Sequence, residues 1–99
     1  MIVRLLPEAK RDLRTIGLYI ARDNPGRAES FVAELGIKAD GLSTMASSFP
    51  FARLPQHPDV RRRLHGRYAI YYSIDIEAAC VDVHRIVHSS QDIERLFNE

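Results

Sequence analysis

The chain has 99 residues, a formal net charge of +1, 45% hydrophobic residues and a single cysteine, Cys80. A chain of this length has room for one hydrophobic core, so we expect one domain over residues 1–99. The apolar content is too high for a disordered protein, and one cysteine excludes an internal disulfide. No apolar run approaches the ~20 residues of a membrane helix, and the N-terminus lacks the pattern of a secretory leader. We therefore expect a cytoplasmic protein with no membrane partner.

The first half of the chain predicts a strand and two helices. Residues 2–6 predict a short strand, and Pro7 suits the first position of a helix because its missing N–H is not needed there. Apolar residues then recur at helical spacing up to Ile20. Asn24 predicts the N-cap of a second helix, whose apolar stripe continues as far as Met45. We expect the two helices to form a hairpin laid on a sheet.

The second half of the chain predicts three strands. After a loop that contains three prolines, residues 60–65 predict a strand that turns at Gly66. Residues 68–74 alternate in the manner of a half-buried strand, and residues 81–88 are rich in β-branched side chains. The predicted fold class is α+β, in the order β-α-α-β-β-β(-α), with the helical hairpin packed on a mainly antiparallel four-stranded sheet.

The C-terminal residues predict a short amphipathic helix. Ser89, answered by Asp92 three residues later, resembles a capping box that opens this helix. Ile93, Leu96 and Phe97 then form one apolar face. This face either packs on the sheet or contacts a partner, and both interpretations stay open.

An excess of arginine falls in one stretch of the chain. Residues 53–67 hold five arginines and one acid, which gives a local charge of +4 against −3 for the rest. In an extended segment Arg61, Arg63 and His65 point to one face. Such charge either protects an edge strand from aggregation or, with Arg67 in the same patch, binds acidic protein or phosphate.

The last predicted strand carries two histidines, His84 and His88. Four residues of strand span about 13 Å, which is too far for one metal ion to bridge, so we expect no metal site. We also expect no cofactor, because the sequence has no phosphate-binding glycine loop. A ribonuclease would need a histidine base, a tyrosine acid, and Arg61, Arg63 or Arg85 at the phosphate. Nothing in the spacing makes these groups converge.

Tyr71 differs from the other tyrosines of its predicted strand. Tyr68 and Tyr72 belong to the apolar alternation and are expected in the core. Tyr71 points to the opposite face, where it either packs as well or contacts a partner through its ring.

The sequence resembles a known family at four places in the right order. Residues 81–93, VDVHRIVHSSQDI, resemble the closing motif of ParE-type toxins, the gyrase-directed branch of the ParE/RelE superfamily. That motif has alternating β-branched residues, then Arg-Ile/Val-x-His, a short linker and an Asp. Residues 9–20, 24–31 and 68–72 also resemble the two helices and the middle strand of these toxins, so the resemblance covers nearly the whole chain.

The resemblance implies a toxin of a type II toxin–antitoxin system. It implies growth inhibition by binding DNA gyrase without catalysis or sequence-specific nucleic-acid binding. It also implies a partly disordered, ParD-like antitoxin as partner. RelE-type relatives instead cut mRNA on the ribosome, which is the alternative function, with His84, His88 and Arg85 as its candidate catalytic residues. An inactive member kept as a binding module is a third reading.

The matched motif also suggests which residues bind the antitoxin or the target. Arg85, His88 and Asp92 match the motif, whereas Gln91 stands where family members commonly have Arg, which puts potency or target in question. The candidate binding residues are Arg61, Arg63, Arg67, Tyr71, Arg85, His88, Asp92, Ile93 and Phe97.

Overall fold

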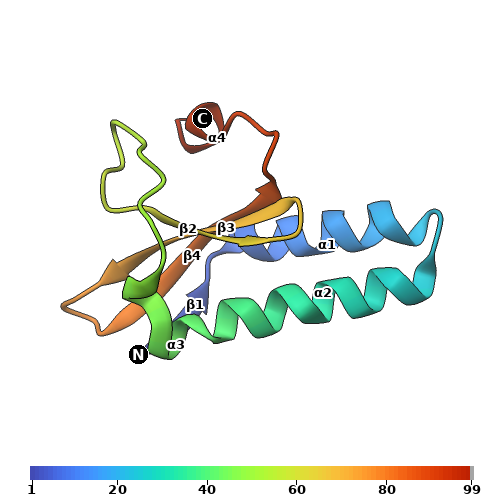
Figure 1. Ribbon diagram of the computed structural model, residues 1–99, viewed down its shortest axis with the longest axis horizontal. Helices are drawn as coiled ribbons and strands as arrows, with labels where there is room; N and C mark the ends of the chain where they lie inside the picture. The colour runs from blue at the N-terminus through green and yellow to red at the C-terminus, as the bar shows by residue number, and fades with distance from the viewer. Residues whose placement is uncertain (99) are drawn as a thin grey trace.

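The computed structural model describes residues 1–98 as a four-stranded sheet with helices (Figure 1). None of the helices in this part of the chain is long and apolar enough to cross a membrane. The predicted fold class is confirmed. The elements are β1 (Ile2–Leu5), α1 (Pro7–Ala21), α2 (Pro25–Asp40), α3 (Leu42–Met45), a 3-10 turn (Ala46–Ser48), β2 (Arg61–His65), β3 (Tyr68–Asp75), β4 (Cys80–His88) and α4 (Ile93–Phe97).

The sheet has the strand order β1-β4-β3-β2. β2, β3 and β4 form an antiparallel meander, and its first turn contains Gly66 at a φ of 57°, a left-handed conformation that favours glycine. β1 is parallel to β4 and pairs only with its first four residues, Cys80–Val83. The second half of β4 therefore has a strand neighbour on one side only, and α1 begins beside it.

The helical hairpin covers one face of the sheet and forms the larger core. Pro7 occupies the first turn of α1, and the side chain of Asn24 accepts a hydrogen bond from the Arg27 N–H at the start of α2, as predicted. Leu35 is fully buried between the helices and the sheet, and the Tyr72 hydroxyl donates to the Ala46 carbonyl over 2.6 Å. The predicted apolar stripes thus meet on this face.

The second helix ends earlier than the apolar pattern predicts. α2 stops at Asp40, and the chain turns at Gly41 into the short α3. A Cβ atom at Gly41 would lie 3.1 Å from a guanidinium nitrogen of Arg63, which reaches over from β2 to donate to the Lys38 carbonyl. The absence of a side chain at Gly41 lets this arginine approach the end of the helix.

A second, smaller core lies on the other face of the sheet. Residues 50–60 fold back over this face and bury Leu54 there. All but the last of them belong to the predicted loop of residues 47–59. α4 packs beside them through its apolar side chains, so the packing interpretation of the C-terminal helix is the correct one. Figure 1 shows both segments on the side of the sheet opposite to α1 and α2. The core residues are Leu54, Val60, Ala69, Tyr71 and Val87, with Ala52, Ile93, Leu96 and Phe97 packed against them.

The start of α4 corrects the predicted capping box. Asp92, not Ser89, is the N-cap, and its carboxylate accepts the Arg95 N–H. Ser89 lies three residues before this N-cap, and its N–H still donates to the Arg67 carbonyl, continuing the β3–β4 ladder by one step. Ser90 and Gln91 then turn the chain toward α4.

Candidate functional site

An apolar recess lies between the two long helices. It has a volume of about 500 Å³ and lies where Gly17 faces Val32. A Cβ at Gly17 would lie 3.3 Å from a Val32 methyl carbon, so the glycine allows the helices to approach closely here. Leu18 is 72% exposed at its rim. The lining is completed by Leu13, Arg14, Ala28 and Glu29. A groove of this kind suits the apolar face of a partner helix, with a charge of each sign at its edges.

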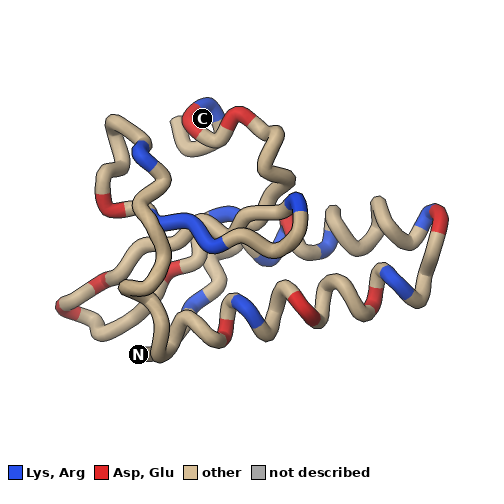
Figure 2. The backbone as a smooth tube through the Cα atoms, viewed as in Figure 1, with Lys and Arg blue, Asp and Glu red and all other residues tan. Residues whose placement is uncertain are grey.

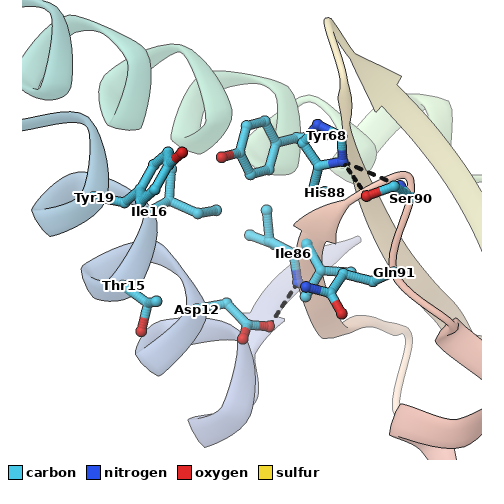
Figure 3. Close-up of a pocket in the computed structure, with 10 residues that line it drawn as sticks. Asp12, Thr15, Ile16, Tyr19, Tyr68, Ile86, His88, Ser90 and Gln91 are labelled. Carbon is cyan, nitrogen blue, oxygen red and sulfur yellow. Dashed lines mark hydrogen bonds between the residues drawn. The ribbon is translucent and has the colours of Figure 1, made fainter.

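A second cleft lies on the other side of α1, against the end of β4 (Figure 3). Its volume is about 370 Å³. Burial raises the pKa of the Tyr68 phenol, and the nearby Tyr19 adds to this rise. The phenols of both tyrosines point into the same part of the cleft in Figure 3. The lining residues are Asp12, Thr15, Ile16, Tyr19, Tyr68, Ile86, Val87, His88, Ser90 and Gln91.

His88 borders this cleft at the end of β4. Its Nδ1 lies 2.7 Å from the Ser90 hydroxyl and accepts the Ser90 N–H over 3.1 Å. Its ring meets Tyr68 edge to face, with centroids 5.3 Å apart. These contacts fix the ring orientation and join β4 to the following turn, so the side chain orders the wall of the cleft.

Arg85 is held inside the fold by Asp12 of α1. Its guanidinium makes two hydrogen bonds to this carboxylate, over 2.8 and 2.9 Å, and the same carboxylate accepts the Ile86 N–H over 2.9 Å. Asp12 therefore bonds to the edge of β4 where β1 has already ended. Arg85 thus ties α1 to β4, and its contact with a phosphate or a partner stays a prediction.

His84 lies on the opposite face of the sheet from His88. Its Nε2 is 2.7 Å from the Ser73 hydroxyl, and its ring packs near Phe97, with centroids 5.6 Å apart. Burial lowers the pKa of His84, while the carboxylate of Asp82 acts in the other direction. The two histidines and Arg85 thus do not converge on a common point among the described residues.

The arginines of β2 contact the chain itself on one face, as their alternation predicts. Arg61 donates to the Phe49 carbonyl over 2.7 Å and stacks on the Phe51 ring, while Arg63 donates to the Lys38 carbonyl over 3.0 Å in the last turn of α2. A cation at a helix C-terminus is stabilising there. Figure 2 shows these basic positions following β2. Arg67 lies exposed in the turn after this strand.

Tyr71 is buried, which corrects its prediction as a surface contact. It is 2% exposed and packs edge to face against Phe97, with centroids 6.2 Å apart. The predicted face is right, but residues 50–60 and α4 cover it. For the same reason Ile93 and Phe97 point toward the sheet, and Asp92 serves as the cap of α4.

The resemblance implies grooves beside the helical hairpin for the apolar side chains of an antitoxin, but the sequence did not give the residues that line the groove, nor Asp12 as the partner of Arg85. Leu18 falls outside the apolar stripe of its helix, and this is the available signal for an apolar surface on the far side of α1. Asp12 is an acid within the apolar stripe next to Leu13, a position where a charge needs a buried partner.

The comparisons with known proteins agree with this architecture. The family model described as "ParE toxin of type II toxin-antitoxin system, parDE" matches residues 3–93. This chain belongs to the ParE toxin family. No curated protein matches the sequence.

Two solved structures are similar to this ParE family member over most of their length. One is from the chromosomal ParDE toxin–antitoxin system of Pseudomonas aeruginosa, with a TM-score of 0.74 and 18% identity, covering 89% of this chain and 95% of that one. The other is from the toxin–antitoxin complex RelBE2 of Mycobacterium tuberculosis, with a TM-score of 0.65 and 26% identity, covering 88% and 95%. The chain is thus a toxin of the type II class with the ParE/RelE fold.

Proposed function

We propose that this toxin acts by binding DNA gyrase, without catalysis of its own, and that a cognate antitoxin neutralises it. The observation that carries the choice between the two branches of the superfamily is the engagement of Arg85 by Asp12. A ribonuclease needs a cation at the phosphate next to a base. Here the guanidinium is bound within the fold, and His84 and His88 lie on opposite faces.

The surface we assign to gyrase lies where two turns meet. The Ser89 N–H donates to the Arg67 carbonyl over 2.7 Å, which brings the turn after β2 beside the turn after β4. Arg67, Ser90 and Gln91 are all exposed on these turns. An exposed arginine is suited to bidentate contact with a carboxylate of a protein target.

The antitoxin is assigned to the groove between α1 and α2. Both similar structures come from toxin–antitoxin systems, and the groove is a predominantly apolar recess. A disordered antitoxin segment can form a helix as its apolar face enters such a groove. The cations near β2, the half-buried Arg62 and the exposed Arg67 among them, then meet its acidic residues.

The test is supercoiling of relaxed plasmid by gyrase with titrated purified toxin. We expect inhibited supercoiling or accumulated cleaved DNA, and His88→Ala is expected to keep the effect because no step requires a base. Gln91→Arg restores the residue common in the family and should lower the inhibitory concentration, whereas Gln56→Arg, at an exposed loop position, should not. Unaffected gyrase with folded toxin would contradict the proposal. Cleavage of mRNA in a translating extract, lost in folded His88→Ala, would establish the ribonuclease alternative.

A further inference from the structure

The edge of β4 changes its hydrogen-bonding partner halfway along the strand. The Leu6 N–H donates to the Val83 carbonyl, and this is the last bond between the segment of β1 and β4. A bulge follows, because Tyr71 pairs with Arg85 while Tyr72 pairs with Val83, which leaves His84 as the extra residue. Along a regular strand, every second residue turns its backbone N–H and C=O away from the neighbouring strand. The bulge moves this alternation by one residue, so different residues of β4 face away from β3 after it.

After the bulge, the backbone groups of Ile86 and His88 face the outer edge. The Ile86 N–H donates to Asp12, and the Ser89 N–H donates back to the Arg67 carbonyl on the β3 side, which sets the alternation. The His88 carbonyl accepts the Gln91 N–H over 3.0 Å. Two backbone groups on this edge have no partner among residues 1–98, the Ile86 carbonyl and the His88 N–H.

These two groups can bond to an incoming strand that pairs at Val87. In a parallel bridge, one residue of the incoming chain donates its N–H to the carbonyl of residue i−1 and accepts the N–H of residue i+1. The Ile86 carbonyl and the His88 N–H provide this arrangement around Val87. An antiparallel strand can use the same two groups, because a non-hydrogen-bonded pair at Val87 is also flanked by bonds from residues 86 and 88. The Ile86 N–H and the His88 carbonyl already have partners, so an incoming strand of either direction would pair at Val87.

The cleft of about 370 Å³ lies directly beside this edge (Figure 3). Side chains of Ile86 and the hairpin residue Ile16 face it, together with the phenols of Tyr19 and Tyr68. The residues that flank a bridging residue would place their side chains toward this wall, because strand side chains alternate. The wall is apolar with hydroxyl groups at its rim, so it suits apolar or aromatic side chains.

We propose that an extended segment of the antitoxin enters this cleft and continues the sheet beside β4, in the place where β1 stops. The proposal rests on the proposed antitoxin partner. It follows from continuity along α1, since Arg14 and Leu18 line the groove assigned to the antitoxin helix, whereas Thr15 and Tyr19 line the cleft. One chain that crosses α1 reaches both. An antitoxin segment bound in this cleft covers Gln91 and so hides the surface assigned to gyrase.

The test measures amide hydrogen exchange by NMR in the free toxin and in its complex with the protein encoded beside its gene. We expect the His88 amide to exchange at least tenfold more slowly in the complex, with the amide of Glu77, in the turn at the other end of β4, unchanged. A complex in which His88 exchanges as before would overturn this proposal and leave the antitoxin assignment intact. Failure of the two proteins to associate would overturn both.

A pair of variants tests the cleft without relying on exchange. Thr15→Trp places a large ring at an exposed position on the cleft wall, and Thr44→Trp places the same ring on exposed α3, away from either recess. We expect Thr15→Trp to weaken antitoxin binding at least tenfold and Thr44→Trp to leave it within twofold, with both variants folded. Equal affinities for the two variants would exclude a partner chain in the cleft.

Discussion

The two faces of the sheet are covered in different ways. On one face, the 15 residues of α1 and 16 residues of α2 lie against β3 and β4 and bury a continuous set of side chains. On the other, residues 50–60 and the five residues of α4 cover a smaller core, and no side chain of α4 itself is fully buried. Helices this short are not stable alone. Residues 50–60 and α4 therefore need the sheet in order to stay folded, whereas the sheet is stabilised mainly by the hairpin of α1 and α2.

This difference leads to a difference in expected motion. Regions with few buried apolar contacts open locally at low free-energy cost, while the main core opens only on global unfolding. We expect the hairpin face to set the stability of the whole fold and the second face to respond locally. The following predictions test this contrast, in order of decreasing effect.

The largest effect is expected for Leu35→Ala in the hairpin core. Leu35 is fully buried, and its truncation should lower the free energy of unfolding by about 2–5 kcal/mol through lost burial and an unfilled cavity. Urea denaturation measures the change. Ile37→Ala on the same helix, at a residue 71% exposed, is the control and should stay within about 0.5 kcal/mol. Similar losses for the two variants would contradict the assignment of the core.

A smaller effect is expected for Phe97→Ala on the second face. Phe97 contacts Tyr71, His57 and His84, and it is half-buried, so its loss should cost about 1–2 kcal/mol. Hydrogen exchange should quicken in α4 and residues 50–60 while the amides of α2 keep their protection relative to global unfolding. Ile76→Ala, at a residue 85% exposed, serves as control. Loss of protection in α2 to the same degree as in α4 would show that the two faces unfold together.

The smallest effect is a pH dependence that comes from the second face. Burial lowers the pKa of His84 in the fold, so below the unfolded value of about 6.5 the unfolded chain binds a proton that the folded chain does not. The stabilising contribution is complete above that pH and is lost as the pH falls. His84→Gln should therefore lose less stability than the wild type between about pH 7.5 and about pH 5.5. Urea midpoints at both pH values measure this, and equal losses would refute the role of His84.

The hairpin and the meander were predictable because their signals are local. Apolar residues at helical spacing, the Asn24 cap and the alternation around Tyr72 each follow from neighbours within a few residues. The same signals place Arg61 and Arg63 on one face correctly. They do not tell what those guanidinium groups meet, because the Phe49 and Lys38 carbonyls are brought there by the tertiary fold.

The second face was not predictable for the opposite reason. Residues 50–60 have no periodicity, and Leu54 gives no local sign that it will be buried. The burial of Tyr71 follows from this cover and so was missed. The pairing of Arg85 with Asp12 joins residues 73 positions apart, and sequence spacing cannot reveal a contact of that range. The groove and the cleft arise from the same long-range packing on either side of α1.

The parallel pairing of β1 with β4 has a consequence for synthesis of the toxin. The first strand cannot join the sheet until Cys80–Val83 exist, so the sheet stays open along one edge while most of the chain is being made. Contacts between such distant segments also slow folding. A nascent toxin therefore passes through a stage in which both helices are complete but the sheet is not. On the proposed assignment of the antitoxin to the groove between α1 and α2, it can meet the helices in that interval, before the fold is finished.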